Sequence, residues 1–243
     1  MTPFTVVDQT SQRQDLARRK EVKYAIVGAD AGKLRSHLSI NCRRQVHNGP
    51  VSTVRSIYFD DARLSACQAN LDGVGIRNKL RLRWYDTLRP RRDAFLEIKW
   101  RDNRVTGKHR MQLQSVDPLH QLSYAQIMDG LHETVPEQYQ HFLLRYNEPV
   151  AIVEYKREHF VSDDGSLRVT LDYDLTFYDQ LGRQSISTDF ACRMDDLVVL
   201  EGKLPVGRET DLRRLLQPFA ARANRCSKYV HGCRLLGHIF GGE

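Results

Sequence analysis

The stretch IRNKLRLRWY, residues 76–85, decides how this chain is expected to fold. Read with a period of two, it places four cations on one side: Arg77, Lys79, Arg81 and Arg83. The opposite side carries mainly apolar residues: Ile76, Leu80, Leu82 and Trp84. Such alternation is typical of a β-strand whose two faces meet different surroundings. We therefore predict a strand with one basic face and one face packed into a core.

Four cations in a row on one face repel each other. Neighbours on the same face of a strand are about 7 Å apart, which costs about 2 kcal/mol per pair at an effective dielectric near 20. A solvated strand tolerates that repulsion, and this remains one interpretation of the stretch. An enclosed face tolerates it only when it binds a polyanion, which is the alternative interpretation.

The excess of positive charge is concentrated in this part of the sequence. The 243 residues contain 37 Lys and Arg against 30 Asp and Glu, a formal charge of +7. Residues 77–110 alone contain twelve Lys and Arg against four Asp and Glu. Because the rest of the chain is nearly neutral, one segment, and not the whole protein, is expected to attract acidic partners.

Cysteine usage and hydropathy predict the compartment. The five cysteines are odd in number and form no CxxC pair, so neither a disulfide framework nor a zinc site is expected. The sequence shows no signal peptide and no apolar run of about 18 residues. We expect a cytoplasmic protein without a transmembrane segment, for which a membrane partner would have to be another protein.

The remaining periodicity predicts an antiparallel α+β fold in one domain. Residues 1–17 are predicted to be a flexible N-terminal tail, and 18–243 a single domain. Strands are expected at 20–27, 54–61, 76–85, 94–101, 108–113, 150–160, 166–179 and 196–204. Helices are expected at 28–40, 62–73, 209–219 and 227–240, with two more between 122 and 146, and Asp30 is a plausible N-cap for the first.

Several other predicted strands also carry a basic face. Three contain the pattern E-x-K, which places a carboxylate and an ammonium group on the same side: Glu21 with Lys23, Glu97 with Lys99, and Glu201 with Lys203. Further cations lie at Lys108, Arg110, Arg157 and Arg168, with Tyr155 on the face of Arg157. If about eight strands close into a barrel, these faces line an interior that fits side chains or one small ligand. A linear polyanion would match cations spread along strands.

An ordered set of segments resembles the VTC domain, the polyphosphate polymerase branch of the CYTH, or triphosphate tunnel metalloenzyme, superfamily. The segments are KEVKY, SIYFDD, IRNKLRLRWY, FLEIKWR, TGKHR, VEYKREHF, LRVTLDYDL, VLEGKL and CSKYV. They run from about Arg18 to Leu236, nearly the whole chain. The resemblance implies an antiparallel eight-stranded β-barrel tunnel with flanking helices. It also implies Mn²⁺ or Mg²⁺, and growth of polyphosphate from the γ-phosphate of ATP.

The resemblance also implies roles for individual residues. The predicted catalytic cations, which would contact the phosphates, are Arg81, Arg83, Lys99, Arg157 and Arg168. The predicted substrate-binding residues are Lys23, Arg77, Lys79, Lys108, Arg110, Tyr155, Lys203, Ser227 and Lys228. Glu201 matches the metal-binding carboxylate, and Glu97 is either a second ligand or a buried counter-ion. The superfamily begins with E-x-E-x-K, but Arg19 stands where the first Glu would be, which argues against a second metal there.

Three functions from different classes remain open at this stage. A polymerase would use ATP and inorganic polyphosphate, a triphosphatase would use water as the acceptor in the same tunnel, and a sensor would bind polyphosphate or inositol polyphosphates without turnover. Nucleic acid is not expected as a partner, because Trp84 and Trp100 alternate away from the cations and leave no aromatic platform beside them. The oligomeric state cannot be predicted from these patterns.

Overall fold

The computed structural model describes residues 4–15, 18–46 and 49–239 of the protein. All eight predicted strands are confirmed in it as β2, β4 to β9 and β11. The strands are β1 (Phe4–Asp15), β2 (Arg19–Val27), β3 (Arg43–Gln45), β4 (Ser52–Asp60), β5 (Ile76–Tyr85), β6 (Asp93–Asp102), β7 (Val105–Ser115), β8 (Glu148–Val161), β9 (Arg168–Asp179), β10 (Cys192–Met194) and β11 (Leu197–Pro205).

The six predicted helical regions are confirmed as well. They are α1 (Ala31–Asn41), α2 (Ser65–Leu71), α3 (Tyr124–Thr134), α4 (Glu137–Arg145), α5 (Glu209–Leu216) and α6 (Lys228–Leu235), with 3₁₀ turns η1 (Leu119–Gln121) and η2 (Gln217–Phe219). Asp30 caps α1 as predicted, because its carboxylate accepts hydrogen bonds from the backbone of Gly32 and Lys33.

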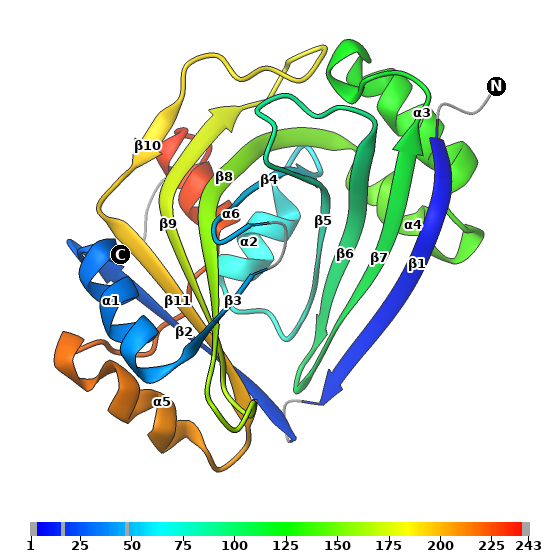
Figure 1. Ribbon diagram of the computed structural model, residues 1–243. Helices are drawn as coiled ribbons and strands as arrows, with labels where there is room; N and C mark the ends of the chain where they lie inside the picture. The colour runs from blue at the N-terminus through cyan, green and yellow to red at the C-terminus, as the bar shows by residue number, and fades with distance from the viewer. Residues whose placement is uncertain (1–3, 16–17, 47–48, 240–243) are drawn as a thin grey trace.

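The strands form one strongly curved antiparallel sheet (Figure 1). Its order is β1-β7-β6-β5-β4-β8-β9-β11-β2, while β3 pairs with β8 and β10 with β9. The described sheet differs from the predicted closed barrel of eight strands in two respects. Eleven strands are present in the described residues, and no pairing between β1 and β2 is found there to close the sheet. The fold is α+β with a large antiparallel sheet and flanking helices.

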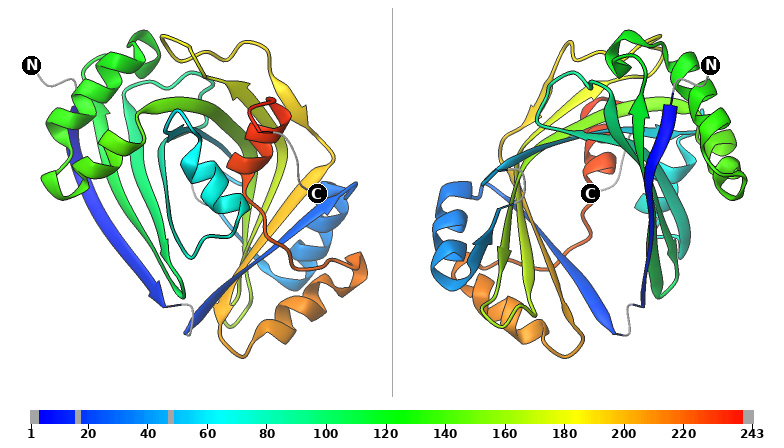
Figure 2. Two further views of the ribbon diagram at one scale, coloured as in Figure 1. Left: turned by 180° about the vertical axis from the view of Figure 1, so that it is seen from behind. Right: turned by 45° about the vertical axis from the view of Figure 1, so that its right-hand side comes forward.

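A segment from the end of the chain occupies the free edge of β2. The Asn224 backbone N–H donates to the carbonyl of Lys23 (2.9 Å), and the Asn224 side chain exchanges hydrogen bonds with the backbone of Ala25. These groups would be the pairing sites for β1 in a closed barrel. The end of β1 and the start of β2 lie close together, and the two edge strands then diverge (Figure 2).

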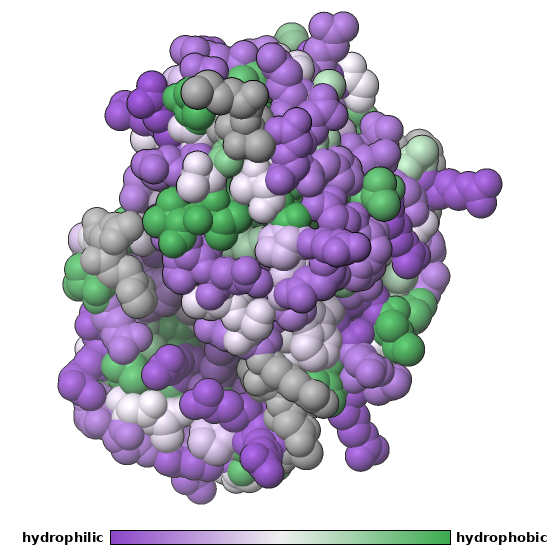
Figure 3. Space-filling model, turned by 90° about the vertical axis from the view of Figure 1, so that its right-hand side faces the viewer, coloured by the Kyte–Doolittle hydropathy of each residue, from purple (hydrophilic) through white to green (hydrophobic). Residues whose placement is uncertain are grey.

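The predicted flexible tail is also wrong over most of its length. Phe4–Asp15 is strand β1, which pairs with β7 from Phe4↔Ser115 to Asp15↔Val105. Phe4 is buried in the hydrophobic core. Residues 1–3 and 16–17 of the predicted tail lie outside the described residues. The side of the molecule that carries β1, α3 and α4 is largely hydrophilic, with separate hydrophobic patches (Figure 3).

Helices cover both faces of the curved sheet. On the convex face, α3 and α4 pack against β5, β6 and β7, and α1 and α5 pack against β9 and β11. Inside the curve lie α2 and α6 (Figures 1 and 2). At Gly232 of α6, a Cβ atom would come within 2.7 Å of the Phe177 ring, so the close packing of this helix on β9 requires glycine.

Strand β5 has the two unlike faces that its sequence predicts. Leu80, Leu82 and Trp84 are buried in the convex core under α3 and α4. The four alternating cations consequently point to the concave side, which α6 partly fills. The burial of the apolar face is therefore what fixes the register of the basic face.

Candidate anion-binding site

The concave face carries one continuous group of charged side chains, which we call the belt. The register of neighbouring strands brings these side chains together. Arg81 of β5 lies opposite Tyr58 of β4 on one side and Glu97 of β6 on the other, and Glu97 lies opposite Arg110 of β7. One step along the same strands, Lys79, Lys99 and Lys108 form a second row. The period of two therefore places these side chains on a single surface.

Glu97 is the counter-ion of the first group of cations, and its side chain is only 1% exposed. Its carboxylate accepts a hydrogen bond from Arg81 Nε (2.7 Å), and Arg83, Lys108 and Arg110 approach it to 3.5–3.7 Å. Burial acts to raise the pKa of Glu97, but Arg81, Arg83 and the nearby lysines outweigh it and lower that pKa well below its usual range. The structure therefore favours the interpretation of Glu97 as a buried counter-ion.

Asp172 of β9 is the counter-ion of a second group, and it is fully buried. Arg157 donates two hydrogen bonds to its carboxylate (2.6 and 2.7 Å), and Lys228 of α6 donates a third (2.6 Å). Tyr155 lies under both cations, with its ring centroid 5.2 Å from Arg157 Cζ and 4.7 Å from Lys228 Nζ. The pKa of Tyr155 is raised by burial, but Arg157, Arg83 and Lys228 reverse this and leave it lowered.

A third group surrounds Glu201 of β11. Lys23 and Lys203 approach its carboxylate to 3.6 and 3.4 Å, and the same two lysines contact Glu21 at 3.1 and 3.8 Å. Burial opposes the charge of Lys23, yet Glu201 and Glu21 prevail and raise its pKa. Burial likewise acts against the Glu201 charge, while Lys23, Lys203 and Arg157 lower the pKa of that carboxyl well below its usual range.

Glu201 and Glu21 are the oxygen donors that a divalent metal could use on this face. Within the described residues, no cluster of three or more His, Cys, Asp or Glu side chains could hold a metal without other ligands. Mg²⁺ in phosphate-transfer sites is often held by one or two carboxylates together with phosphate oxygens. The donor set therefore fits the protein's share of such a site.

Lys79 and Lys99 differ from the other cations of the belt. They are partners in the β5–β6 register, and in the described part of the chain no carboxylate oxygen lies within 4.0 Å of either ammonium group. Arg81 and burial lower the pKa of Lys99 well below its usual value, although its side chain is reached by solvent. Burial, together with Lys23, Arg77 and Arg81, lowers the pKa of Lys79 to about 7. An anion would relieve the repulsion at this point.

Most of the predicted site residues converge on this face. The group that does comprises Lys23, Lys79, Arg81, Arg83, Glu97, Lys99, Lys108, Arg110, Tyr155, Arg157, Glu201, Lys203, Ser227 and Lys228. Two cations lie at its ends. Arg77 donates to the backbone carbonyl of Val74, and Arg168, at the start of β9, is exposed and lies opposite Lys203.

Sequence reasoning missed three residues that hold the cations in place. Asp172 binds Arg157 and Lys228, the Tyr58 hydroxyl accepts from Arg81 (2.7 Å), and the Ser56 hydroxyl accepts from Arg83 (3.0 Å). Glu21, which the E-x-K pattern placed on the same side as Lys23, does contact it. A signal was present, because Ser56 and Tyr58 alternate on β4 and Asp172 alternates with Arg168 on β9.

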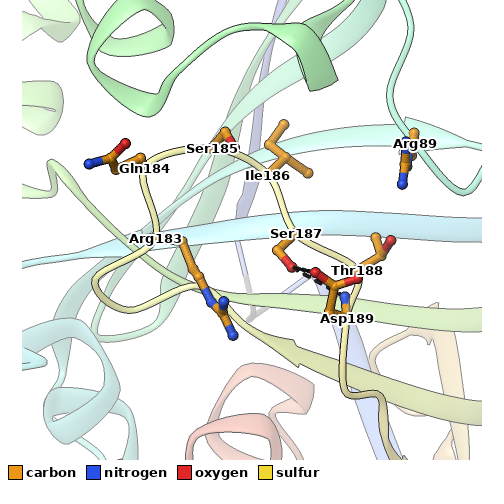
Figure 4. A pocket seen from close by; sticks show the side chains of 8 residues that line it. All are labelled: Arg89, Arg183, Gln184, Ser185, Ile186, Ser187, Thr188 and Asp189. Atoms are coloured by element: carbon orange, nitrogen blue, oxygen red, sulfur yellow. Dashed lines mark hydrogen bonds between the residues drawn. The ribbon is translucent and has the colours of Figure 1, made fainter.

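Two cavities lie away from the basic face. One, of about 310 Å³, is formed by residues 183–189, which precede β10, together with Arg89 of the β5–β6 loop (Figure 4). Arg183 and Arg89 extend from different segments there, and Ser187 bonds Asp189. The other, of about 350 Å³, lies between α1 and α5 and includes His37, Cys42 and Leu215. Neither contains a residue of the belt.

Comparisons with known proteins bear on this geometry. The family described as the VTC domain matches residues 18–237. A search of curated proteins found no match. Among solved structures, the chain is similar to HpAC1 from Hippeastrum, a putative adenylyl cyclase reported to have a dominant triphosphatase activity (16% identity, TM-score 0.43, covering 87% of this chain and 93% of that one). It is also similar to the PH1819 protein from Pyrococcus horikoshii OT3 (13% identity, TM-score 0.46, 90% and 100%). Across the described residues, no helix combines the length and apolar character needed to cross a bilayer.

Proposed function

The chain belongs to the VTC domain family, whose chemistry concerns phosphate and polyphosphate, and from this premise we propose that it is an ATP-dependent polyphosphate polymerase. The single observation that supports the proposal most is the belt itself. Cations from β2, β5, β6, β7, β8 and α6 face one concave surface, and within the described residues Lys79 and Lys99, in its middle, have no carboxylate oxygen within 4.0 Å. A linear chain of phosphates matches this distribution better than a compact anion does.

The reaction requires positioning more than covalent chemistry from the protein. The terminal phosphate oxygen of the acceptor chain attacks the γ-phosphorus of ATP, the new P–O bond forms, and the bond to the β-phosphate bridging oxygen breaks to leave ADP. Arg81, Arg83, Lys99, Arg157 and Arg168 would bind the transferring group and its neighbours, because arginines bind phosphate oxygens bidentately and lysines act as point charges. The remaining cations would hold the product chain.

Glu201, with Glu21 beside it, would hold Mn²⁺ or Mg²⁺. When bound, the metal would neutralise charge on the phosphates. The protein's own contribution is then to keep the acceptor and donor phosphates in line, through cations whose positions are set by Glu97, Asp172, Tyr58 and Ser56.

The state of the carboxylates favours a polymerase over a triphosphatase. A hydrolase benefits from a general base to activate water, whereas an acceptor phosphate is already anionic. Glu97, Asp172 and Glu201 are each paired with cations, and each has a lowered pKa, which makes them weak bases. For this reason we rank hydrolysis as the second candidate and binding without turnover as the third.

Incubation of the purified chain with ATP and Mn²⁺ tests the proposal. Gel staining would detect long polyphosphate, and a second assay would follow free phosphate. A ladder of long chains is expected. Free phosphate without chains would replace the proposal by a triphosphatase, and tight polyphosphate binding without turnover would replace it by a sensor. Glu209→Gln is a suitable control, because Glu209 pairs with Lys20 away from the belt.

A further inference from the structure

Resting on the proposed function, we propose that Lys79 takes up a proton from solvent when a phosphate chain binds. The basic face would then reach its full charge only with the ligand in place. The inference concerns one side chain in the middle of the belt, and it adds a proton to the binding reaction that the family assignment does not imply.

Most of the groups that face Lys79 are cationic. Arg77 and Arg81 lie on either side along β5, Lys99 lies opposite on β6, and Lys23 of β2 acts across the concave face. The elements inside the curve contribute Cys67 of α2 and Ser227, the N-cap residue of α6. Of these neighbours, only the Cys67 thiol favours the charged form of Lys79.

The geometry holds the Lys79 amine inside this cationic surrounding. Its Nζ donates a hydrogen bond to Ser227 Oγ at 2.8 Å, and Ser227 is the N-cap of α6, so the amine cannot simply turn away to solvent without losing this contact. With burial as the largest cause, these surroundings lower the pKa of Lys79 to about 7. Near neutral pH a large share of the free protein therefore carries a neutral amine at this position.

A bound polyanion reverses the balance. Phosphate oxygens beside the amine favour its charged form, so Nζ gains a proton from water or buffer and becomes a –NH₃⁺ group. The neighbouring Arg81 and Arg83 cannot take part, because guanidinium groups stay charged at any relevant pH. Lys23 is kept charged by Glu201 and Glu21, whose proximity raises its pKa. Lys99 also has a lowered pKa, so an experiment must separate its contribution.

Calorimetry of the full chain with inorganic tripolyphosphate, in the presence of a metal chelator, measures the proton directly. Titrations in two buffers of different ionisation enthalpy give the number of protons taken up. Each measurement is repeated with two variants. Lys79→Arg keeps a positive charge but does not titrate, and Lys79→Met has neither a positive charge nor a titratable group. Lys20→Arg is the control, because Lys20 pairs with Glu209 away from the belt.

The expected result is a difference between wild type and the Lys79 variants. At about pH 8 the wild type should take up close to one proton more than Lys79→Arg, and near pH 6 the difference should vanish, because the amine is then already charged. Lys20→Arg should behave as wild type. Equal proton counts for wild type and both Lys79 variants would overturn the inference while leaving the proposed function intact. Absence of any binding heat would contradict polyanion binding itself and the inference with it.

Discussion

Glu97 and Glu201 occupy equivalent places in the same E-x-K pattern, yet their surroundings differ. Glu97 is 1% exposed and contacts four cations that, within the described residues, have no other carboxylate within 4.0 Å. Glu201 is 12% exposed and shares its two lysines with Glu21. The comparison suggests that Glu97 stays paired with its cations, whereas Glu201 can exchange its lysines for another cation. Identical sequence patterns can therefore serve stability at one position and ligand exchange at another.

The largest effect is expected from Glu97→Gln. Removing one partner of a buried ion pair costs about 3–5 kcal/mol, because the remaining charges stay buried and uncompensated. Four cations lose their counter-ion here, so we expect a loss of stability of this size in chemical denaturation. Glu201→Gln should cost less, since Glu21 still contacts Lys23 and Lys203. Equal losses of stability for the two variants would contradict the distinction between Glu97 and Glu201.

The second prediction concerns turnover, for which the order of the two variants is reversed. Glu201→Gln should lower metal-dependent turnover at least about 100-fold, close to 2.7 kcal/mol of transition-state stabilisation, while its melting temperature changes little. Turnover is measured as polyphosphate formed from ATP with Mn²⁺, with Glu209→Gln as the control. Activity of Glu201→Gln within a few fold of wild type would refute its assignment as the metal-binding carboxylate.

A smaller effect should appear in the dependence of stability on acid. The pKa of Glu97 is lower in the folded chain than its ordinary value of 4.5, so its charge stabilises the fold above that pH. The contribution is lost as the pH falls through the folded value, by about 1.4 kcal/mol per pH unit for one proton. Denaturation between about pH 3 and 6 should therefore show a shallower slope for Glu97→Gln than for wild type. Parallel slopes would mean that Glu97 does not titrate with unfolding.

The smallest effect, on tripolyphosphate affinity, is expected for cations that lie near neither Glu97 nor Glu201. Arg89 borders the cavity formed with residues 183–189 and lies apart from the belt. Arg89→Ala should change tripolyphosphate affinity less than about twofold, whereas Lys99→Met should weaken it at least about tenfold, one charge-assisted contact being worth about 1.5–3 kcal/mol. Similar losses for the two variants would show that binding depends on net charge and not on the belt.

Much of the fold could be predicted because its strands have two unlike faces. Leu80, Leu82 and Trp84 alternate with cations, and this alone placed β5 and predicted which side would be basic. Strand β1 escaped prediction because its apolar residues end at Val7 and, among its residues whose burial is described, only Phe4 is fully buried. From Asp8 onward the strand is polar and is held by backbone pairing with β7, so the alternation of Phe4 and Val6 is too short a hydrophobic period to detect.

The site was predictable where charge alternates and hidden where polar residues act as partners. Arg81, Arg83 and Lys99 were identified from their pattern, but Asp172 and Tyr58 were not, because a single acid or tyrosine in a strand has many ordinary roles. The position of α6 was also beyond the sequence. Tyr229, Val230 and Cys233 indicate a buried helix, yet an apolar helix face can pack on either side of a sheet. Barrel closure depends on the two edge strands, and no residue pattern showed that Asn224 occupies the edge of β2.

The late position of Asn224 and α6 in the chain has a consequence for biosynthesis. All eleven strands leave the ribosome before these residues do, so a nascent chain passes through a stage in which the edge of β2 is open and Ser227 and Lys228 are missing from the basic face. An unpaired strand edge is a template for intermolecular pairing, and an incomplete cationic face attracts the surrounding RNA. Synthesis of the segment from Asn224 to the end of α6 thus ends this vulnerable period.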